Sequence, residues 1–282
     1  GQNEIWTTDA NGIFSSSTVW LTDAQAVSDG YENTFSKDID NDGLISGGTY
    51  YQLLGDNGPV TLRNKKNTSS FNDNSSPLWN VIAAKNNSSS FQVLVDGAGS
   101  RDGQNEIWTT DANGIFSSST AWLTDAQAVA NGYENTFSKD FDNDGLISGG
   151  TYYQLLGDNG PVTLRNESNT SSFNDDSSSL WNVIAAKNNS SSFQVLVEGT
   201  GSRVRQNKVW TTDANGIVST STGWITDAQA VSDGYENTFS KDFDNDGLIS
   251  GGTYYQLLGD DGPVTLRNKR NTSSFNDESS NS

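Results

Sequence analysis

Three carboxylates stand at alternate positions in one short stretch of the chain: Asp38, Asp40 and Asp42, followed directly by Gly43. Carboxylates this close repel one another, so a bound cation would explain why a fold holds them together. Calcium takes about six to eight oxygen ligands, and the first half of an EF-hand loop presents them at positions 1, 3, 5 and 7, with glycine at position 6. The spacing therefore predicts a calcium loop with the three Asp side chains and the Leu44 carbonyl as ligands.

The loop departs from a complete EF-hand at position 12, which falls on Thr49, where a bidentate Glu would close the coordination shell. Ser46 at position 9 could contribute directly or through water. The missing ligand comes from elsewhere, from water, or not at all, so we expect a structural site of modest affinity. Extracellular calcium modules work at about 10⁻⁴ to 10⁻³ M. The alternative is a solvated acidic turn, because Asn, Asp and Gly favour turns.

The same loop occurs three times, and Trp6, Trp108 and Trp210 mark a period of 102 residues. Residues 1–78 and 103–180 differ at eight positions, which indicates a recent duplication, so identity between copies says little about which residues matter. The equivalent predicted ligands are Asp140, Asp142, Asp144 and Leu146 in the second copy, and Asp242, Asp244, Asp246 and Leu248 in the third.

Each copy must fold so that a helix leads into its acidic loop and a hairpin follows it. Glu32 and Phe35, three residues apart, indicate the entering helix, which Gly30 separates from an earlier turn that Thr22 or Asp23 caps. The other expected segments are strands over 3–8, 13–21, 49–54, 59–64, 78–84 and 91–95, and a flexible polar loop over 65–77. Asp9-Ala-Asn-Gly12 is interpreted as a hairpin turn rather than as a second metal loop.

These elements predict a β-rich α+β fold made of tandem, near-identical repeats of about 102 residues. Each repeat would hold several β-hairpins, a short broken helix and an EF-hand-like calcium loop. A unit of this length can form its own core. The predicted domains are a partial unit at 1–48, complete units at 49–150 and 151–252, and a partial unit at 253–282.

Composition limits the class of protein. The chain has 35 acidic and 16 basic side chains, a net charge of −19, and no Cys or His. Nucleic acid is an unsuitable partner for so acidic a chain, because binding it needs a basic surface. No apolar run approaches the roughly 20 residues that span a bilayer. Without disulfides, a metal would stiffen small domains, so we expect a secreted, calcium-loaded protein at the cell surface.

The order of the motifs resembles a known family. The motifs are Tyr50-Tyr51-Gln-Leu-Leu, Leu78-Trp79-Asn-Val-Ile-Ala-Ala84, Phe91-Gln-Val-Leu-Val95, Ile107-Trp108, Glu134-Asn-Thr-Phe137 and Asp140-Phe-Asp-Asn-Asp-Gly145. Together they are similar to the tryptophan-rich C-terminal domain family of large cyanobacterial surface proteins. The resemblance covers nearly the whole chain and implies an exported, multi-repeat, calcium-binding surface protein without a defined chemistry.

Catalysis is not expected. Without His and Cys, the chain cannot form Ser–His or Cys–His nucleophile pairs or the usual zinc sites. Two classes remain: a structural segment of an extracellular fibre, which we favour, and an adhesin or carbohydrate-binding array in which many weak sites act together. Tyr50, Tyr51 and the tryptophans could stack on a surface polysaccharide, but aromatic residues in strands more often form a core.

The chain begins at Gly1, inside a repeat and without Met, so we expect residues to precede it. Residues 1–48 lack the strands that come before them in a complete unit, and residues 253–282 lack those that follow. Open strand edges invite pairing with another chain. The expected partners are therefore copies of the chain itself, assembled head to tail into a filament; the alternative is that both ends are cuts in a longer array.

Overall fold

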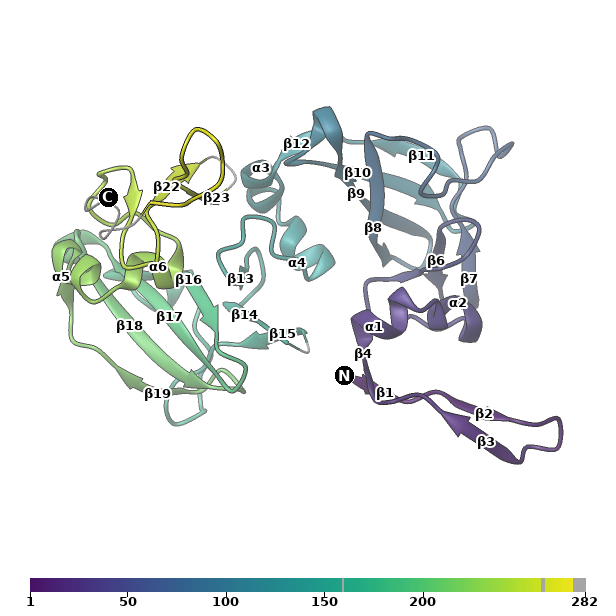
Figure 1. The fold of residues 1–282 in the computed structure, drawn as a ribbon, viewed down its shortest axis with the longest axis horizontal. Coiled ribbons are helices and arrows are strands. Elements are labelled where there is room, and N and C mark those ends of the chain that lie inside the picture. The colour runs from purple at the N-terminus through teal and green to yellow at the C-terminus, as the bar shows by residue number, and fades with distance from the viewer. Residues whose placement is uncertain (159, 260–261, 276–282) are drawn as a thin grey trace. The chain divides into compact units, whose positions relative to one another are not determined.

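The computed structural model describes residues 1–282 apart from 159, 260–261 and 276–282 (Figure 1). It divides into two compact units, Gly1–Ala130 and Asn131–Ser282. Both consist mainly of antiparallel strands with a few short helices, and the order of elements repeats along the chain. The predicted β-rich fold of repeated units of about 100 residues is therefore confirmed.

The first unit holds fifteen strands and helices of regular type and one 3₁₀ turn. They are β1 (Gln2–Asn3), β2 (Trp6–Thr8), β3 (Phe14–Ser17), β4 (Leu21–Thr22), α1 (Asp23–Ser28), α2 (Tyr31–Phe35), β5 (Leu44–Ile45), β6 (Gln52–Gly55), β7 (Gly58–Thr61), β8 (Trp79–Asn86), β9 (Ser90–Gly97), η1 (Gly99–Arg101), β10 (Gln104–Asp111), β11 (Phe116–Ser119), β12 (Leu123–Thr124) and α3 (Asp125–Ala130).

The second unit continues the same order from the second short helix of the repeat. Its described elements are α4 (Tyr133–Phe137), β13 (Leu146–Ile147), β14 (Gln154–Gly157), β15 (Gly160–Thr163), η2 (Asp175–Ser177), β16 (Trp181–Asn188), β17 (Ser192–Gly199), η3 (Gly201–Arg203), β18 (Gln206–Asp213), β19 (Val218–Ser221), β20 (Ile225–Thr226), α5 (Asp227–Ser232), α6 (Tyr235–Phe239), β21 (Leu248–Ile249), β22 (Gln256–Gly259) and β23 (Gly262–Thr265).

The helix before the acidic loop is interrupted at Gly30, as predicted. Thr22 caps α1 through a capping box, in which the Gln25 N–H donates to Thr22 Oγ1 and the Thr22 N–H donates to Gln25 Oε1. Gly30 has a φ of +78° and begins α2, because only a residue without Cβ adopts this conformation at no cost. The break turns α2 so that its last turn leads into the loop.

A three-stranded antiparallel sheet follows each loop, in the order β5-β6-β7 in the first copy. The two-residue strand β5 pairs Leu44 with Leu53, and β6 pairs Leu53 with Val60. The hairpin closes between Gly55 and Gly58, where φ at Gly58 is +112°. The end of the loop thus forms β5, which pairs with the first strand of the β6–β7 hairpin that the sequence predicted.

A larger sheet forms the framework of each repeat. In the first unit its order is β11-β10-β9-β8, with β12 pairing β10, and all pairings are antiparallel. The long pairings run from Trp79 opposite Gly97 and from Asn105 opposite Asp96. The second unit repeats the arrangement as β16-β17-β18-β19 with β20. This sheet joins the two long strands that follow one acidic loop, β8 and β9, to the β10–β11 hairpin that precedes the next.

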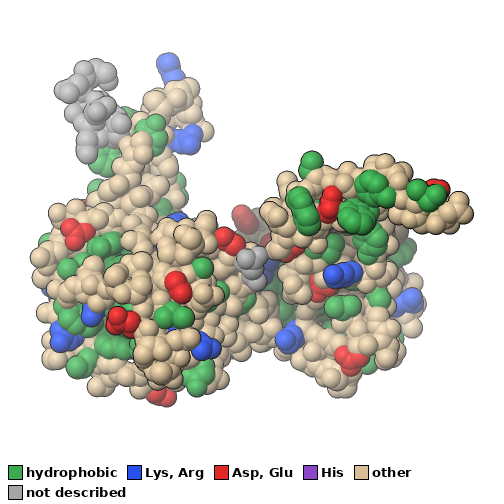
Figure 2. All heavy atoms as spheres, turned by 90° about the horizontal axis from the view of Figure 1, so that it is seen from below, with side chains coloured by type: hydrophobic (Ala, Val, Ile, Leu, Met, Phe, Trp, Pro, Cys, Tyr) green, Lys and Arg blue, Asp and Glu red, His purple; other side chains and the backbone are tan. Residues whose placement is uncertain are grey.

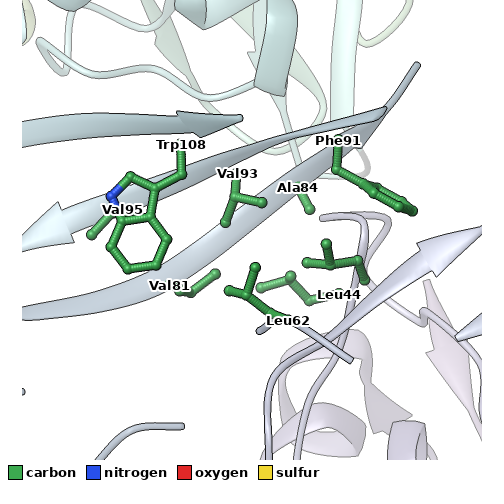
Figure 3. Packing of buried hydrophobic residues seen from close by; sticks show 9 residues of the cluster. Leu44, Leu62, Val81, Ala84, Phe91, Val93, Val95 and Trp108 are labelled. Atoms are coloured by element: carbon green, nitrogen blue, oxygen red, sulfur yellow. The ribbon is translucent and has the colours of Figure 1, made fainter. Parts of the chain in front are cut away.

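The core lies between the three-stranded sheet and one face of the larger sheet (Figure 3). In the first unit the buried cluster is Leu44, Leu53, Leu62, Val81, Ala84, Phe91, Val93, Val95 and Trp108. The Trp108 ring centroid lies 4.9 Å from that of Trp79 and 5.2 Å from that of Phe71. Trp108 therefore packs in the core, as expected of aromatic residues in strands, and Trp210 does so in the second unit, whereas Trp6 and Trp20 are exposed.

The opposite face of the second larger sheet is also covered. Val195 and Val197 belong to the cluster of the inner face, while Leu196 between them belongs to a second cluster, as the alternation along a strand requires. That second cluster includes Phe239 from α6 and Phe243 from the acidic loop. The helix α6 and the acidic loop of the third copy thus each pack one Phe side chain against this face of the sheet.

The hairpin of β2 and β3 carries exposed aromatic side chains. Trp6 is 67 % exposed and Trp20 is 63 % exposed, whereas Trp108, which occupies the position of Trp6 in the next repeat, is 7 % exposed. Residues 1–18 and 103–120 have the same sequence. The difference arises because β10 pairs with β9 and packs in the core, while β2 pairs only with β3. Figure 2 shows that hydrophobic side chains reach the surface among polar ones.

Candidate metal centre

A carboxylate group forms where α2 leads into the acidic loop. Carboxylate oxygens of Glu32, Asp38 and Asp40 lie within 4.8 Å of one another. Two of these three residues are predicted ligands, and Glu32 was not among the predictions. An oxygen-only group of this kind suits a hard cation such as calcium.

Glu32 is the most enclosed member of the group, with no exposed surface. Its Oε1 accepts a hydrogen bond of 2.7 Å from the Ile39 N–H, and its Oε2 accepts one of 2.8 Å from the Ser46 N–H. The side chain therefore ties the beginning of the loop to its end. To a bound cation it would offer the carboxylate that position 12 lacks, from a residue that precedes the loop rather than follows it.

The remaining loop oxygens are arranged by backbone donors. The Gly43 N–H donates to Asp38 Oδ2 over 2.9 Å, and the Leu44 N–H donates to Asp42 Oδ1 over 2.8 Å. Asp38 Oδ1 is shielded from solvent and accepts no hydrogen bond. A buried carboxylate oxygen without a partner is costly, and a cation would satisfy it. The residues present therefore fit an oxygen-coordinated metal.

The second and third copies repeat this geometry. Their groups are Glu134, Asp140 and Asp142, and Glu236, Asp242 and Asp244, each again with carboxylate oxygens within 4.8 Å. The two loop-spanning hydrogen bonds recur at 2.8 Å from Phe141 and Ser148 to Glu134, and from Phe243 and Ser250 to Glu236. The third predicted carboxylates, Asp42, Asp144 and Asp246, lie outside these groups of carboxylates.

The electrostatics of the loop link Asp42 to the group. Burial, together with the charges of Asp40, Asp38 and Glu32 and against the Leu44 hydrogen bond, raises the pKa of Asp42 to about 7. In the second copy burial and the Asp142 charge raise the pKa of Asp144 to about 8. Burial also raises the pKa of Asp38 and of Asp140. Without a cation, these carboxylates resist ionisation.

The calcium-free protein is expected to lose stability as the pH rises from about 4 towards 8. Asp42 and Asp144 ionise near 3.8 when unfolded but only near 7 and 8 when folded, so the folded state binds more protons in this window and its stability falls. A cation would keep them ionised and remove the slope. Urea unfolding across this pH range, with chelator and with calcium, measures both slopes; equal slopes would contradict a cation at these carboxylates.

Each of the first two loops also docks on the neighbouring long strand. The Ala84 N–H donates to the Asp42 carbonyl over 2.7 Å, and the Leu54 N–H donates to the Gly43 carbonyl over 2.9 Å. Gly43 has a φ of +84°, and a Cβ there would lie 1.8 Å from the Ala84 carbonyl oxygen. Glycine at position 6 is therefore required twice, by the turn and by the close approach of β8.

In the third copy the loop glycine keeps the positive φ but has no described strand close to it, so the two reasons for glycine can be tested separately. Gly145 and Gly247 have φ values of +83° and +84°, but a Cβ would lie 1.9 Å from the Ala186 carbonyl oxygen at Gly145 and would meet nothing within 4 Å at Gly247. We expect Gly145→Ala to cost about 1–3 kcal/mol of unfolding free energy more than Gly247→Ala, because only the first overpacks. Chemical denaturation of the two variants measures this; equal losses would mean that backbone strain alone requires glycine.

In the turn at Asp9, the carboxylate accepts hydrogen bonds from backbone N–H groups. Asp9 Oδ1 accepts hydrogen bonds of 2.9 Å from the N–H groups of Asn11 and Ile13, and the same turn recurs at Asp111. Neither residue belongs to a carboxylate group in the part of the chain that is described. The geometry is that of a hairpin turn, which is how the sequence was interpreted.

Comparison with known proteins identifies one family. A model of the family described as the tryptophan-rich Synechocystis species C-terminal domain matches residues 45–149 and again residues 146–251, which together exceed half of the chain. The two matches lie in tandem and each contains one complete set of the strands described above. No curated protein and no solved structure matched the chain. Within the described residues, no helix has the length and hydrophobicity needed to span a membrane.

Proposed function

Since the chain belongs to the tryptophan-rich Synechocystis C-terminal domain family, we propose that it is an extracellular, calcium-binding structural protein. In this proposal it forms a segment of a surface fibre whose repeats follow one another head to tail, and it has no catalytic activity. The tandem order of the repeats supports a structural array, because such proteins extend by adding similar units.

The observation that carries the proposal is the carboxylate group built three times around a fully buried Glu. In the first copy Glu32, Asp38, Asp40, Asp42 and the Leu44 carbonyl would hold the ion. Bound calcium would offset the repulsion between these carboxylates and join α2 to β5. The second and third copies would use the equivalent residues, so each repeat would carry one ion between its helix and its hairpin.

The fibre is supported by the way in which one repeat passes into the next. The larger sheet takes β8 and β9 from one sequence repeat and β10 to β12 from the following one, without a flexible linker between them. The β2–β3 hairpin has the same sequence as the β10–β11 hairpin, but its Trp6 is exposed where the equivalent Trp108 is buried. A strand from another copy of the protein is the partner that we propose for this hairpin.

Calcium titration combined with electron microscopy tests the proposal. We expect three calcium ions per chain by isothermal titration calorimetry, and filaments in calcium that shorten or disappear in excess chelator. If no binding heat is measured up to millimolar calcium, the result would contradict the metal sites. Three bound ions with monomers only at every protein concentration would retain the metal sites and reject the fibre.

A second candidate function is a multivalent binding array, and one observation favours it. A hollow recurs beside each three-stranded sheet, with a volume of about 130 Å³ in the first two copies and about 160 Å³ in the third. Tyr50, Tyr152 and Tyr254 lie at these hollows and are about 45 % exposed. Retention on immobilised surface polysaccharide that is lost when all three are replaced by Ala would favour an adhesin over a fibre.

A further inference from the structure

The third copy contains a hollow that is larger than the three beside the Tyr pairs. It has a volume of about 460 Å³, within the range of about 300–1,000 Å³ typical of small-molecule sites. Its walls come from the end of β17 and the η3 turn, from the start of α5, and from the acidic loop of the third repeat. The charged side chains at its wall are Glu198, Arg205, Asp227, Lys241 and Asp242.

The two basic residues of the hollow differ in their partners. Arg205 Nε lies 3.4 Å from Asp227 Oδ2, and Asn207 Nδ2 donates to Asp227 Oδ1 over 2.9 Å, so both oxygens of this Asp are engaged. Lys241 forms no ion pair of 4.0 Å or less with a described residue, although its side chain is half-buried. A lysine without an ion-pair partner at the wall of a hollow is a site for an anionic group of a ligand.

The sequence of the third copy has changed at this wall. Asp102 and Gly103 correspond to Val204 and Arg205, an exchange that raises the charge of this wall by two. Arg205 has a φ of +65° where Gly103 has +71°. A side chain in this conformation costs about 1–2 kcal/mol relative to the ordinary backbone. The third copy thus accepts backbone strain in order to place a cation here.

We propose that this hollow binds an anionic sugar unit, a carboxylate-bearing residue of an acidic polysaccharide. Arg205 and Lys241 would take the carboxylate, and Glu198 would accept hydrogen bonds from sugar hydroxyl groups. A Glu or Asp side chain of a peptide has no hydroxyl groups to donate to that acceptor. The inference rests on the proposed calcium site in one respect, because an ion in the Asp242 loop offsets the negative charge of that wall.

Calorimetry with defined oligosaccharides tests the proposal. The probes are a hyaluronan oligosaccharide, which carries carboxylates, a sulfated dextran oligomer, uncharged dextran and poly-glutamate, each in millimolar calcium. We expect the hyaluronan oligosaccharide to bind and the others to bind at least tenfold more weakly. Equal binding of sulfated dextran would overturn the preference for carboxylate, and equal binding of poly-glutamate would overturn the assignment to a sugar.

Two variants and a matched control test whether the oligosaccharide binds at this hollow. Arg205→Gly restores the residue of the second copy, so we expect the fold to be retained, and Lys241→Ala removes the unpaired cation. Each should weaken binding of the hyaluronan oligosaccharide about tenfold. Lys139→Ala removes the equivalent lysine of the second copy and should leave binding unchanged. An equal loss in Lys139→Ala would overturn the site. Calcium titration of the same samples separates this failure from failure of the metal site.

Discussion

Excess chelator is expected to lower the melting temperature of this protein by about 10 °C relative to about 10 mM calcium, which is about 100 times a dissociation constant of 10⁻⁴ M. A ligand that binds only the folded state, at a concentration of about 100 times its dissociation constant, stabilises by about 2.7 kcal/mol. For a unit of this size each kcal/mol corresponds to a few degrees. The carboxylate groups around Glu32, Glu134 and Glu236 are separated in the unfolded chain, so they hold no preformed site there.

Differential scanning calorimetry with chelator, calcium and magnesium measures this effect. Magnesium is the control, because it requires a smaller octahedral site and should replace calcium poorly. The variant Asp40→Asn/Asp142→Asn/Asp244→Asn changes only exposed carboxylates of the three groups. It should keep the melting temperature of the calcium-free protein and lose most of the response to calcium. The same melting temperature for the parent protein in chelator and in calcium would reject a structural metal.

Local signals in the sequence were sufficient for the helix and the short hairpin. Gly30 marks the break between α1 and α2, and the glycines at 55 and 58 mark the turn between β6 and β7. These features depend on the conformations that single residues allow, so they can be read over a few positions. The period of 102 residues likewise follows from the sequence alone.

Long-range pairing could not be derived in the same way. The larger sheet pairs β9 with both β8 and β10, and nothing in an isolated strand specifies its neighbour. The polar loop over 65–77, expected to be flexible, is held by contacts that only the fold reveals. The Thr68 N–H donates to Asn64 Oδ1 over 2.9 Å, and Arg63 bridges to both Ser70 and Ile115.

The predicted carboxylate group was incomplete for a related reason. The EF-hand pattern places the closing carboxylate at position 12, which is Thr49 in this chain. The structure brings Glu32 to the loop instead, six residues before Asp38, because α2 ends in a left-handed residue, Ser36, that redirects the chain. The Glu recurs in all three copies, but copies this similar share nearly every residue, so recurrence gave no signal.

Replacing Trp108 by Ala is expected to cost about 3–5 kcal/mol of unfolding free energy, the usual range for a buried Trp. Its ring lies within the first core cluster, with centroids of Trp79, Phe71 and Phe116 at 4.9, 5.2 and 5.3 Å. Truncation would leave a cavity between the two sheets, and the aromatic contacts of three neighbours would be lost together. Chemical denaturation followed by circular dichroism measures the loss.

Trp6→Ala is the matched control, because residues 1–18 and 103–120 share one sequence and differ only in their surroundings. Trp6 is mostly exposed and has one aromatic partner, Phe14, at 5.7 Å, so its truncation should change the unfolding free energy by no more than about 0.5 kcal/mol. A large loss in Trp6→Ala at high protein concentration that vanishes on dilution would mean that another copy covers this hairpin. A large loss at every concentration would contradict the exposure of Trp6. Small losses in both variants would contradict a core built on these tryptophans.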